Sequence, residues 1–564
     1  MSTIAKALKF LEVSPGEGVE KVTYLRNKDV IPMGPKRRTW GVWSLMFYWS
    51  ITNVTISTWT GASSLLSLGL SVGETIGIIL IGNVIVATLA LLNAAPGGYF
   101  HIGYTISQRV VFGIRGSSIG IIIRIILSVV WFGSQAYLGS LCLSCIFASW
   151  SHSYLTMKNT IPESVHMNTQ QLVGFVIFQL ISLPPLLLKP ERFNKILMVS
   201  CSLTFFAMLG MTIWAVARNG GSGGPLMHAS SEMSSSTRAW YWIHGICSWY
   251  GSLSAGVSNQ SDFTRFSKKT WSSLYGTIFS LVVVGTIVPL MGLVSASAFQ
   301  DRYGLDIWQP NQVIMFWLEN DYSATSRAAA FFAGTVFTMS QICFNTMGNG
   351  YAGGMDLSGL LPRYFTITRG SIVTALLSWV VQPWDFYNTS STFVTVMSSF
   401  SVFMSPIVGI IIADFWVVRK KHLKLSNLYS DDKEGKYWYF HGVNYRNLII
   451  WVIAFAPALP GLINSVTPSI KVSTGIRNFY YGNTVFEYCI SFFLVTVSSY
   501  IWPYKDVLEE DEFDYFGTFT EEECRAKGIV PYSEVTDKDL QLDPIVSVLS
   551  KDNVIVLARS ASDR

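Results

Sequence analysis

Long apolar stretches recur along almost the whole chain, and polar loops separate them. A helix of roughly 20 apolar residues is long enough to cross a lipid bilayer. We predict twelve such stretches, at residues 43–70, 76–95, 119–148, 171–188, 196–217, 239–258, 271–298, 328–352, 371–387, 391–418, 447–465 and 485–503. The hydrophobic pattern therefore predicts an all-α integral membrane protein with about twelve transmembrane helices.

The polar ends of the chain lie outside this helical body. Residues 1–42 form a polar and basic N-terminal tail, and residues 504–564 form a C-terminal tail that opens with the acidic run 509–514. Because charged segments without apolar periodicity cannot bury a core, we expect the C-terminal tail to be solvated and largely unstructured. The body, 43–503, then accounts for all membrane crossings.

Composition agrees with a body surrounded by lipid. Of the 564 residues, 50% are apolar and 13% are charged, about half the usual charge of a soluble domain. This composition excludes a soluble enzyme, a secreted disulfide scaffold and a disordered protein. The net charge of +5 comes from loops, so no nucleic-acid partner is expected. Cys142 and Cys145 have the spacing of metal ligands, but no second pair or His cluster completes a site, and no metal or cofactor is expected.

The distribution of Lys and Arg predicts the orientation in the membrane. Basic residues gather in the loops after every second stretch and just before the first one. The strongest group, in the loop after the tenth stretch, contains Arg419, Lys420, Lys421, Lys424, Lys433, Lys436 and Arg446. Because loops rich in Lys and Arg stay in the cytosol, we expect the N-terminus there. An even number of crossings then places both termini in the cytosol.

Two apolar stretches are interrupted by small and polar residues. The first contains Trp59-Thr60-Gly61 within 57–64, and the sixth contains Trp249-Tyr250-Gly251 followed by Ser252 within 247–256. These positions correspond if stretches one to five (43–217) and six to ten (239–418) are two copies of one unit, followed by two further helices (447–503). Paired broken helices indicate a transporter substrate site, whereas small residues also serve plain helix packing.

Polar residues in the third and eighth stretches extend this candidate site. Trp131 and Gln135 are four residues apart and share a helix face, and Gln341, Asn345 and Asn349 form a stripe of three amides at the same spacing. A carboxamide both donates and accepts hydrogen bonds. The stripe can therefore bind the edge of a heterocycle while an indole stacks on its face. Interhelical hydrogen bonds are the alternative, and three amides in register favour a polar cavity.

Charged residues refine the expected ligand. Arg124 lies two turns before Trp131, and we expect its side chain to extend to the cytosolic surface. His244 in the sixth stretch is a candidate for proton coupling, or else a hydrogen-bonded structural group. The middles of stretches one, three, six and eight lack carboxylates. That pattern disfavours a localised ammonium and favours a flat neutral ring or a delocalised aromatic cation held by aromatic faces. The apolar stretches contain no nucleophile–base pair of the kind that enzymes use, so an enzyme is not expected.

Several motifs lie between the stretches: Asn27-Lys28-Asp29 and Arg38-Thr39-Trp40, Ser261-Asp262-Phe263-Thr264-Arg265-Phe266, Leu361-Pro362-Arg363-Tyr364 with Arg369-Gly370, and Ala413-Asp414-Phe415. Through them the chain resembles the fungal nucleobase–cation symporter family over nearly its full length. Within that family it is most similar to the thiamine and nicotinamide riboside transporter branch. The segments that carry this closer resemblance are Asn259-Gln260-Ser261-Asp262, Phe386-Tyr387-Asn388, Ser390-Ser391-Thr392-Phe393, Asp514-Tyr515-Phe516-Gly517 and Pro531-Tyr532-Ser533-Glu534.

The resemblance implies a five-plus-five inverted repeat with broken helices 1 and 6, the fold of bacterial leucine transporters. It also implies alternating access and inward uptake driven by a proton. Family substrate contacts fall on Trp131, Gln135 and Asn349. Sodium-dependent members have hydroxyl groups in helix 8 where this chain has Cys343 and Phe344, which argues against sodium.

We therefore expect a plasma-membrane symporter that imports thiamine, with nicotinamide riboside as the second candidate substrate. A carrier of uracil, uridine or allantoin is the alternative within the family, and a non-transporting nutrient sensor is the alternative outside it. Thr60 and Leu253 stand where nucleobase carriers often have Gln and a stacking aromatic ring, whereas Trp131 and Gln135 match the nucleobase type. The partners expected are this small molecule, a proton and the lipid bilayer.

Overall fold

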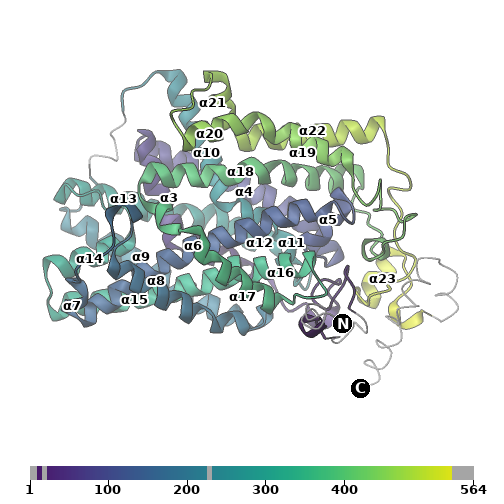
Figure 1. Cartoon of the computed structure of the whole chain (residues 1–564), viewed down its shortest axis with the longest axis horizontal. Coiled ribbons are helices and arrows are strands. Elements are labelled where there is room, and N and C mark those ends of the chain that lie inside the picture. The colour runs from purple at the N-terminus through teal and green to yellow at the C-terminus, as the bar shows by residue number, and fades with distance from the viewer. Residues whose placement is uncertain (1–8, 15–21, 225–230, 536–564) are drawn as a thin grey trace.

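The computed structural model describes residues 9–14, 22–224 and 231–535. Within these ranges the regular structure is helical and no strand forms, apart from three isolated β-bridges. Figure 1 shows the long helices running side by side as one bundle. The predicted all-α class is therefore confirmed.

Nine helical segments of the described chain are long and apolar enough to cross a membrane. They are Val72–Phe100, Ser117–Trp150, Glu163–Leu187, Lys195–Arg218, Ser273–Tyr303, Ala324–Leu360, Thr392–Val418, Tyr445–Val466 and Asn483–Ile501. The other three predicted stretches form α2 (Val42–Asn53) with α3 (Ile56–Leu65), α10 (Ser235–Ser258) and α17 (Ile367–Leu377). Each is helical but short or rich in polar residues, so the total of twelve crossings stays a prediction.

The other α-helices of at least five residues in the described chain are α4 (Val72–Phe100), α5 (Tyr104–Phe112), α6 (Ser117–Trp150), α8 (Thr169–Ser182), α9 (Asn194–Arg218), α11 (Gln260–Thr264), α12 (Ser273–Ile278), α13 (Gly285–Tyr303), α14 (Pro310–Asn320), α15 (Ala324–Phe344), α16 (Tyr351–Leu360), α18 (Ser390–Ile412), α19 (Tyr445–Phe455), α20 (Leu459–Val466), α21 (Thr474–Tyr481), α22 (Asn483–Ile501) and α23 (Glu521–Lys527). Three π-helical turns extend this set, namely η7 (Phe279–Val284), η8 (Asn345–Gly350) and η11 (Ala413–Val418). Such turns occur mainly inside α-helices and often at functional sites.

The first stretch is broken, as predicted, but at a different place. Helix α2 ends at Asn53, Val54 and Thr55 leave the helical conformation, and α3 begins at Ile56. The Thr55 hydroxyl accepts a hydrogen bond from the Thr58 amide at 3.3 Å and so caps the new helix. The prediction that residues 57–64 form the interruption was wrong, because hydroxyls such as that of Ser64 bond back to carbonyls of their own helix.

The sixth stretch is not broken where the sequence predicted it. Helix α10 runs unbroken through residues 247–256 and ends at Ser258. The hydroxyls of Ser252 and Ser254 each donate to a carbonyl three residues earlier, at 2.7 and 2.8 Å, which satisfies them within the helix. Gly251 permits close packing, because a Cβ there would overlap the Met397 carbonyl oxygen of α18. These small residues therefore serve helix packing.

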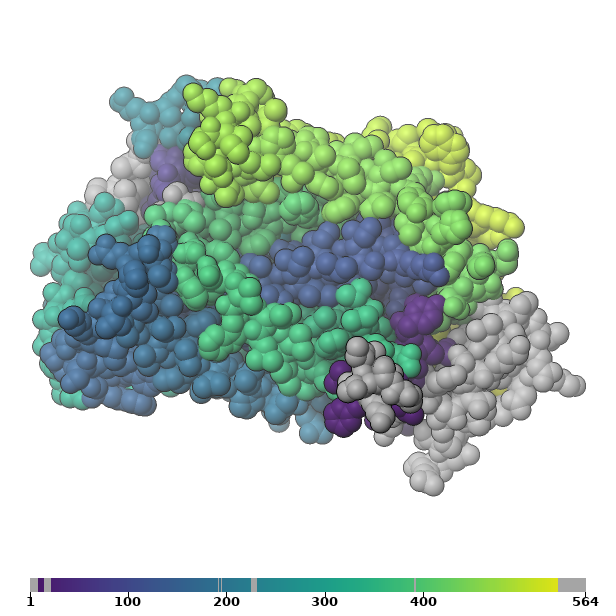
Figure 2. Space-filling view, viewed as in Figure 1, coloured from purple at the N-terminus to yellow at the C-terminus, as the bar shows by residue number. Residues whose placement is uncertain are grey.

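Helix packing places the central elements around one region of the bundle. Helix α18 packs against both α10 and α22, and α6 packs against α15, α8 and α16. The last helices, α19 to α22, lie along one edge of the bundle, where Figure 2 shows them in yellow-green. This arrangement leaves α2, α3, α6, α10 and η8 around the centre.

The segments before α2 and after α22 meet at one end of the bundle, which we call the terminal face (Figure 1). Arg38 donates two hydrogen bonds of 2.9 Å to the Glu523 carboxylate, and Lys424 forms an ion pair of 2.6 Å with Glu509. The prediction of a solvated, unstructured tail was wrong for residues 504–535, because these contacts and the short helix α23 fix that segment. Residues 536–564 lie outside the described part of the chain.

Candidate functional site

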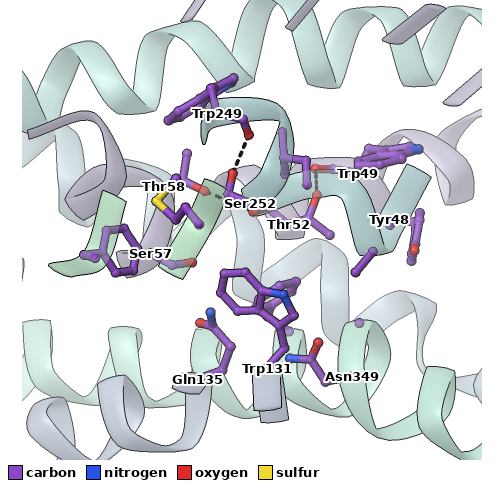
Figure 3. A pocket seen from close by; sticks show the side chains of 17 residues that line it. Tyr48, Trp49, Thr52, Ser57, Thr58, Trp131, Gln135, Trp249, Ser252 and Asn349 are labelled. Carbon is purple, nitrogen blue, oxygen red and sulfur yellow. Dashed lines mark hydrogen bonds between the residues drawn. The ribbon is translucent and has the colours of Figure 1, made fainter. Parts of the chain in front are cut away.

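A cavity lies in the middle of the bundle, between the break in the first stretch, α6, α10, η8 and α18 (Figure 3). Its volume of about 60 Å³ holds several water-sized groups. A planar ring enters it only if the walls move apart. The lining residues are Tyr48, Trp49, Thr52, Ser57, Thr58, Trp131, Gln135, Trp249, Ser252, Leu253, Ala255, Gly256, Phe344, Gly348, Asn349, Phe393 and Met397.

Helix α6 contributes the predicted pair Trp131 and Gln135. One helical turn separates them, so both reach the cavity from the same face. The Trp131 ring lies 5.1 Å from that of Phe400, measured between ring centroids. Gln135 is buried, and neither its amide oxygen nor its amide nitrogen has a hydrogen-bond partner in the described structure. A buried unpaired amide at a cavity wall is available for a ligand.

The π-helical turn η8 contributes Asn349. Its amide nitrogen donates to the Asn345 oxygen at 2.9 Å, and the Asn345 nitrogen donates to the Phe132 carbonyl of α6 at 3.0 Å. This chain of bonds fixes the orientation of Asn349, and Figure 3 shows its side chain beside Trp131 at the cavity floor. Asn345 is buried behind it and positions the amide without lining the cavity.

Helix α10 contributes Trp249 and Ser252 from the opposite side. The Trp249 indole nitrogen donates to the Asn83 oxygen of α4 at 2.8 Å, and Asn83 in turn donates to the Thr286 hydroxyl of α13 at 3.1 Å. The indole also packs directly on Gly82, where a Cβ would overlap it. Trp249 is thus held against α4, and Asn83 links this contact to α13. Figure 3 shows Trp249 across the cavity from Trp131.

The break in the first stretch contributes lining residues that the sequence reasoning missed. Tyr48, Trp49 and Thr52 come from the end of α2, and Ser57 and Thr58 come from the start of α3. Their hydroxyls were detectable in the sequence, but the expected break lay further along. Because the predicted break lay a few residues further along the chain, the prediction named Trp59 and Thr60 as lining residues instead.

A second group of missed residues carries no local signal. Phe344 of α15 and Phe393 and Met397 of α18 are apolar residues that reach the cavity only through the way those helices pack. Leu253, at the position that the resemblance gives to a stacking aromatic ring, also lines the cavity. A Cβ at Gly61 of α3 would contact Met397 and Phe393 at ordinary van der Waals distances. Such neighbours depend on long-range packing, which no spacing within one helix reveals.

Besides Asn345, four more residues predicted for substrate binding do not line the cavity. They are Trp59, Thr60, Tyr250 and Gln341, and all are fully buried elsewhere. Trp59 packs against Gly292 of α13, and Gln341 packs against Gly139 of α6. Gln341 lies about 12 Å along the helix from Asn349, given a rise of about 1.5 Å per residue. A shared helix face does not place residues at the same depth, and a role of these residues in substrate binding stays a prediction.

The predicted coupling residue His244 also lies away from the cavity. It is buried in α10, with its ring 4.4 Å from that of Tyr481 and 5.9 Å from that of Tyr480. Its Nδ1 atom has no hydrogen-bond partner among the described residues. Its role in coupling stays a prediction.

Arg124 adjoins the cavity on the side of the terminal face. Its side chain is 1% exposed, so the expectation that it extends to the surface was wrong. The guanidinium forms an ion pair of 3.3 Å with Asp356 of α16 and donates to the Ala255 carbonyl of α10 at 2.8 Å. Because a buried charge needs a partner, Asp356 retains the arginine inside the bundle.

The lining residues define the chemistry that this cavity offers. Among those described, all are aromatic, aliphatic or neutral and polar, and none is charged. Aromatic faces bind planar rings and delocalised cations, and the amides and hydroxyls bind ring edges. The cavity therefore offers aromatic faces and hydrogen-bonding groups but no charge of its own.

Comparison with known proteins adds to this geometry. Residues 32–485 match the model of a family described as permeases for cytosine/purines, uracil, thiamine and allantoin. The chain is 43% identical to the thiamine transporter THI72 of Saccharomyces cerevisiae, over 95% of this chain and 89% of that protein. It is 42% identical to nicotinamide riboside transporter 1 of the same yeast, over 96% of this chain and 90% of that protein.

Solved structures share the fold at low sequence identity. The structure of Mhp1, a nucleobase-cation-symport-1 family transporter in a closed conformation with bromovinylhydantoin bound, superposes with a TM-score of 0.67 at 20% identity, covering 89% of this chain and 99% of that one. A sialic acid symporter superposes with a TM-score of 0.54 at 11% identity, covering 88% and 96%. The protein is a multi-pass membrane transporter and not an enzyme, and it belongs to the family of permeases for cytosine/purines, uracil, thiamine and allantoin.

Proposed function

We propose that this transporter imports thiamine by proton symport and alternating access. The observation that carries the proposal is the pairing of aromatic walls with an unpartnered amide in a cavity whose described lining is uncharged. Thiamine has a pyrimidine ring with hydrogen-bonding edges and a thiazolium ring with a permanent delocalised charge. Trp131 and Trp249 suit the charged ring, and Gln135 and Asn349 suit the pyrimidine edge.

Nicotinamide riboside is the second candidate substrate. It also joins an aromatic cation to a polar part, and the relative that carries its name is as similar to this chain as the thiamine transporters are. The hydroxyls of Thr52, Ser57 and Thr58 at the helix break are suited to a ribose. The aromatic walls alone do not separate the two cations. Uracil, uridine and allantoin are neutral, so they lack the attraction between a cation and the indole faces.

The proposed membrane is the plasma membrane, with the terminal face and both termini in the cytosol. Support comes from the basic residues Arg419 to Lys424, which follow η11 at the end of the bundle that also holds Arg38 and Glu523. Loops rich in Lys and Arg remain on the cytosolic side. Substrate then enters from the opposite end and leaves past Arg124.

Uptake measurements in cells that lack other carriers of these compounds test the proposal. Expression should raise the entry of labelled thiamine, with saturation, and unlabelled nicotinamide riboside should compete while uracil should not. Unchanged thiamine entry together with raised uracil entry would contradict the assignment. Binding of thiamine without accumulation would indicate a sensor instead.

A further inference from the structure

A buried polar seam runs along the face of α22 that packs against α18. Asn483, Glu487 and Ser491 follow one another at intervals of four residues, and all three side chains have 0% exposure. Asn483 donates to the Ser401 hydroxyl of α18 at 2.8 Å. A spacing of four residues puts these groups on one helix face. The seam begins at the end of the bundle opposite the terminal face.

Glu487 differs from the other buried carboxylates near the spanning helices. Asp356 pairs with Arg124 at 3.3 Å, and Asp414 pairs with Arg419 at 2.6 Å. Both Glu487 oxygens lack a hydrogen-bond partner within the described structure, and no ion pair to Glu487 is formed there. An ionised carboxylate without a partner is very costly in such a place, so Glu487 is stable there in its protonated form.

The surroundings connect Glu487 to the candidate substrate cavity. Its carboxyl group lies close enough to Cys247 and Tyr250 of α10 for electrostatic interaction. Tyr250 directly follows Trp249, which lines the cavity, so one turn of α10 has the cavity on one side and Glu487 on the other. A movement of α10 that admits substrate therefore changes the environment of Glu487.

The same seam offers hydroxyl groups toward the opposite end of the bundle. Tyr480 of α21 forms a hydrogen bond of 2.6 Å with Ser398 of α18, and the Asn483 nitrogen lies 3.3 Å from the Ser398 carbonyl oxygen. His244 of α10 lies beside Tyr480 and Tyr481. These polar groups lie near the start of the seam, at the end of the bundle opposite the terminal face.

We propose that Glu487 is the residue that binds the co-transported proton. This inference rests on the proton symport proposed above and names the site that performs it. A proton from water at the end opposite the terminal face binds a Glu487 carboxylate oxygen and forms an O–H bond. When α10 and α18 move with bound substrate, the O–H bond breaks, the carboxylate contacts water from the terminal face, and the proton leaves there. Intramembrane ionisable residues mark such relays.

Other titratable groups near this position are few. Those facing it are Tyr488 on α22 itself, His244, Cys247 and Tyr250 on α10, and Tyr480 and Tyr481 on α21. The facing part of α18 contributes serines. The charged groups of α19 and η11, Arg446, Asp414 and Arg419, lie toward the terminal face, where Arg446 donates to the Trp502 carbonyl at 2.6 Å. Among these described groups at the seam, Glu487 is the only carboxylic acid.

Purified protein in liposomes tests the proposal, with the membrane potential clamped at zero and the outside one pH unit more acidic than the inside. A one-to-one symporter should accumulate labelled thiamine about tenfold, the factor set by one pH unit. Glu487→Gln should reduce accumulation to equality of the two sides and retain exchange of labelled for unlabelled thiamine. The exposed Glu319 provides the control, because Glu319→Gln should accumulate as wild type does.

Infrared difference spectra between two pH values give a second readout that needs no substrate. One component of the protonated-carboxyl band should respond to pH in wild type and in Glu319→Gln, and this component should be absent in Glu487→Gln. Tenfold accumulation by Glu487→Gln, or an unchanged carboxyl band, would overturn the inference while thiamine transport stands. Absence of thiamine exchange in wild type would overturn the proposed substrate, and the infrared comparison would still decide the proton site.

Discussion

Arg124 and Asp356 form a buried ion pair that joins two helices next to the cavity, with 3.3 Å between nitrogen and oxygen. The same guanidinium donates to the carbonyl of Ala255, a cavity-lining residue of α10. One side chain thus connects α6 and α16 to the helix that carries Trp249.

Removing one partner of this pair should destabilise the protein. Arg124→Met leaves the Asp356 carboxylate buried and unpaired, which costs about 3–5 kcal/mol. We expect a clearly lower unfolding temperature of the purified protein in detergent, measured by the loss of monodisperse protein on heating. The double variant Arg124→Met with Asp356→Leu should recover most of the loss, because no unpaired charge then remains. Equal stability of Arg124→Met and wild type would contradict this account.

Gln135 should show opposite effects on stability and on transport. Its unpaired buried amide costs about 1–3 kcal/mol, so Gln135→Leu should raise the unfolding temperature while it lowers thiamine uptake. Gln341 is the matched control, since its amide is also buried and unpaired but lies outside the cavity. Gln341→Leu should raise stability and leave uptake unchanged. A loss of uptake in both variants would argue against a direct role for Gln135.

Trp131 should contribute to the affinity for thiamine through its indole face. Trp131→Phe keeps a ring but weakens the attraction for a delocalised cation by about 1 kcal/mol, so KM for thiamine should rise about fivefold. Trp59→Phe is the matched control, because Trp59 is also buried but packs on Gly292 and does not line the cavity. Uptake kinetics at equal surface abundance measure both. An unchanged KM for Trp131→Phe would show that the indole does not contact the ligand.

Docking of the C-terminal segment should weaken in acid because of His101. Burial, together with the nearby Arg38 guanidinium, lowers the pKa of His101 from 6.5 to about 4. Between these pH values, His101 therefore binds fewer protons in the docked state than in a state where the segment has left and the histidine is exposed. The stabilisation is complete above about pH 7 and falls as the pH drops toward 4. Limited proteolysis within residues 504–535 should be faster at pH 5 than at pH 7.5.

His101→Gln is the control for this pH dependence. Glutamine can still bond near Arg38, whose nitrogen lies 2.8 Å from His101 Nε2, but it does not titrate. The variant should therefore lose most of the difference in cleavage rate between the two pH values. The same pH difference in the variant and in wild type would assign the effect to another group.

Much of the fold follows from the sequence because lipid imposes strong local rules. Apolar stretches of spanning length determine where helices occur. Trp131 and Gln135 both reach the cavity because residues four positions apart lie on the same face of a helix. The helix break was misplaced because it depends on which hydroxyl caps α3, and Thr55 competes there with several neighbours. Chain-distant neighbours such as Met397 depend on packing between helices, which no local pattern contains.

The buried charges show the same division between local and long-range information. Arg124 and Asp356 are each visible in the sequence, but nothing local joins them across more than two hundred residues. Glu487 interrupts an apolar stretch, a signal that could have been detected. That the Glu487 carboxyl group has no partner in the described structure becomes evident only from the packing of α10, α18 and α22.

Equilibrium binding of labelled thiamine to the purified protein tests the central claim most directly. Wild type should bind thiamine saturably, and Asn349→Ala should bind it about fivefold more weakly, the effect of losing one hydrogen bond of about 1 kcal/mol. Both proteins should have the same unfolding temperature to within a few degrees. Identical affinities in wild type and Asn349→Ala, or no saturable thiamine binding by wild type, would contradict the account.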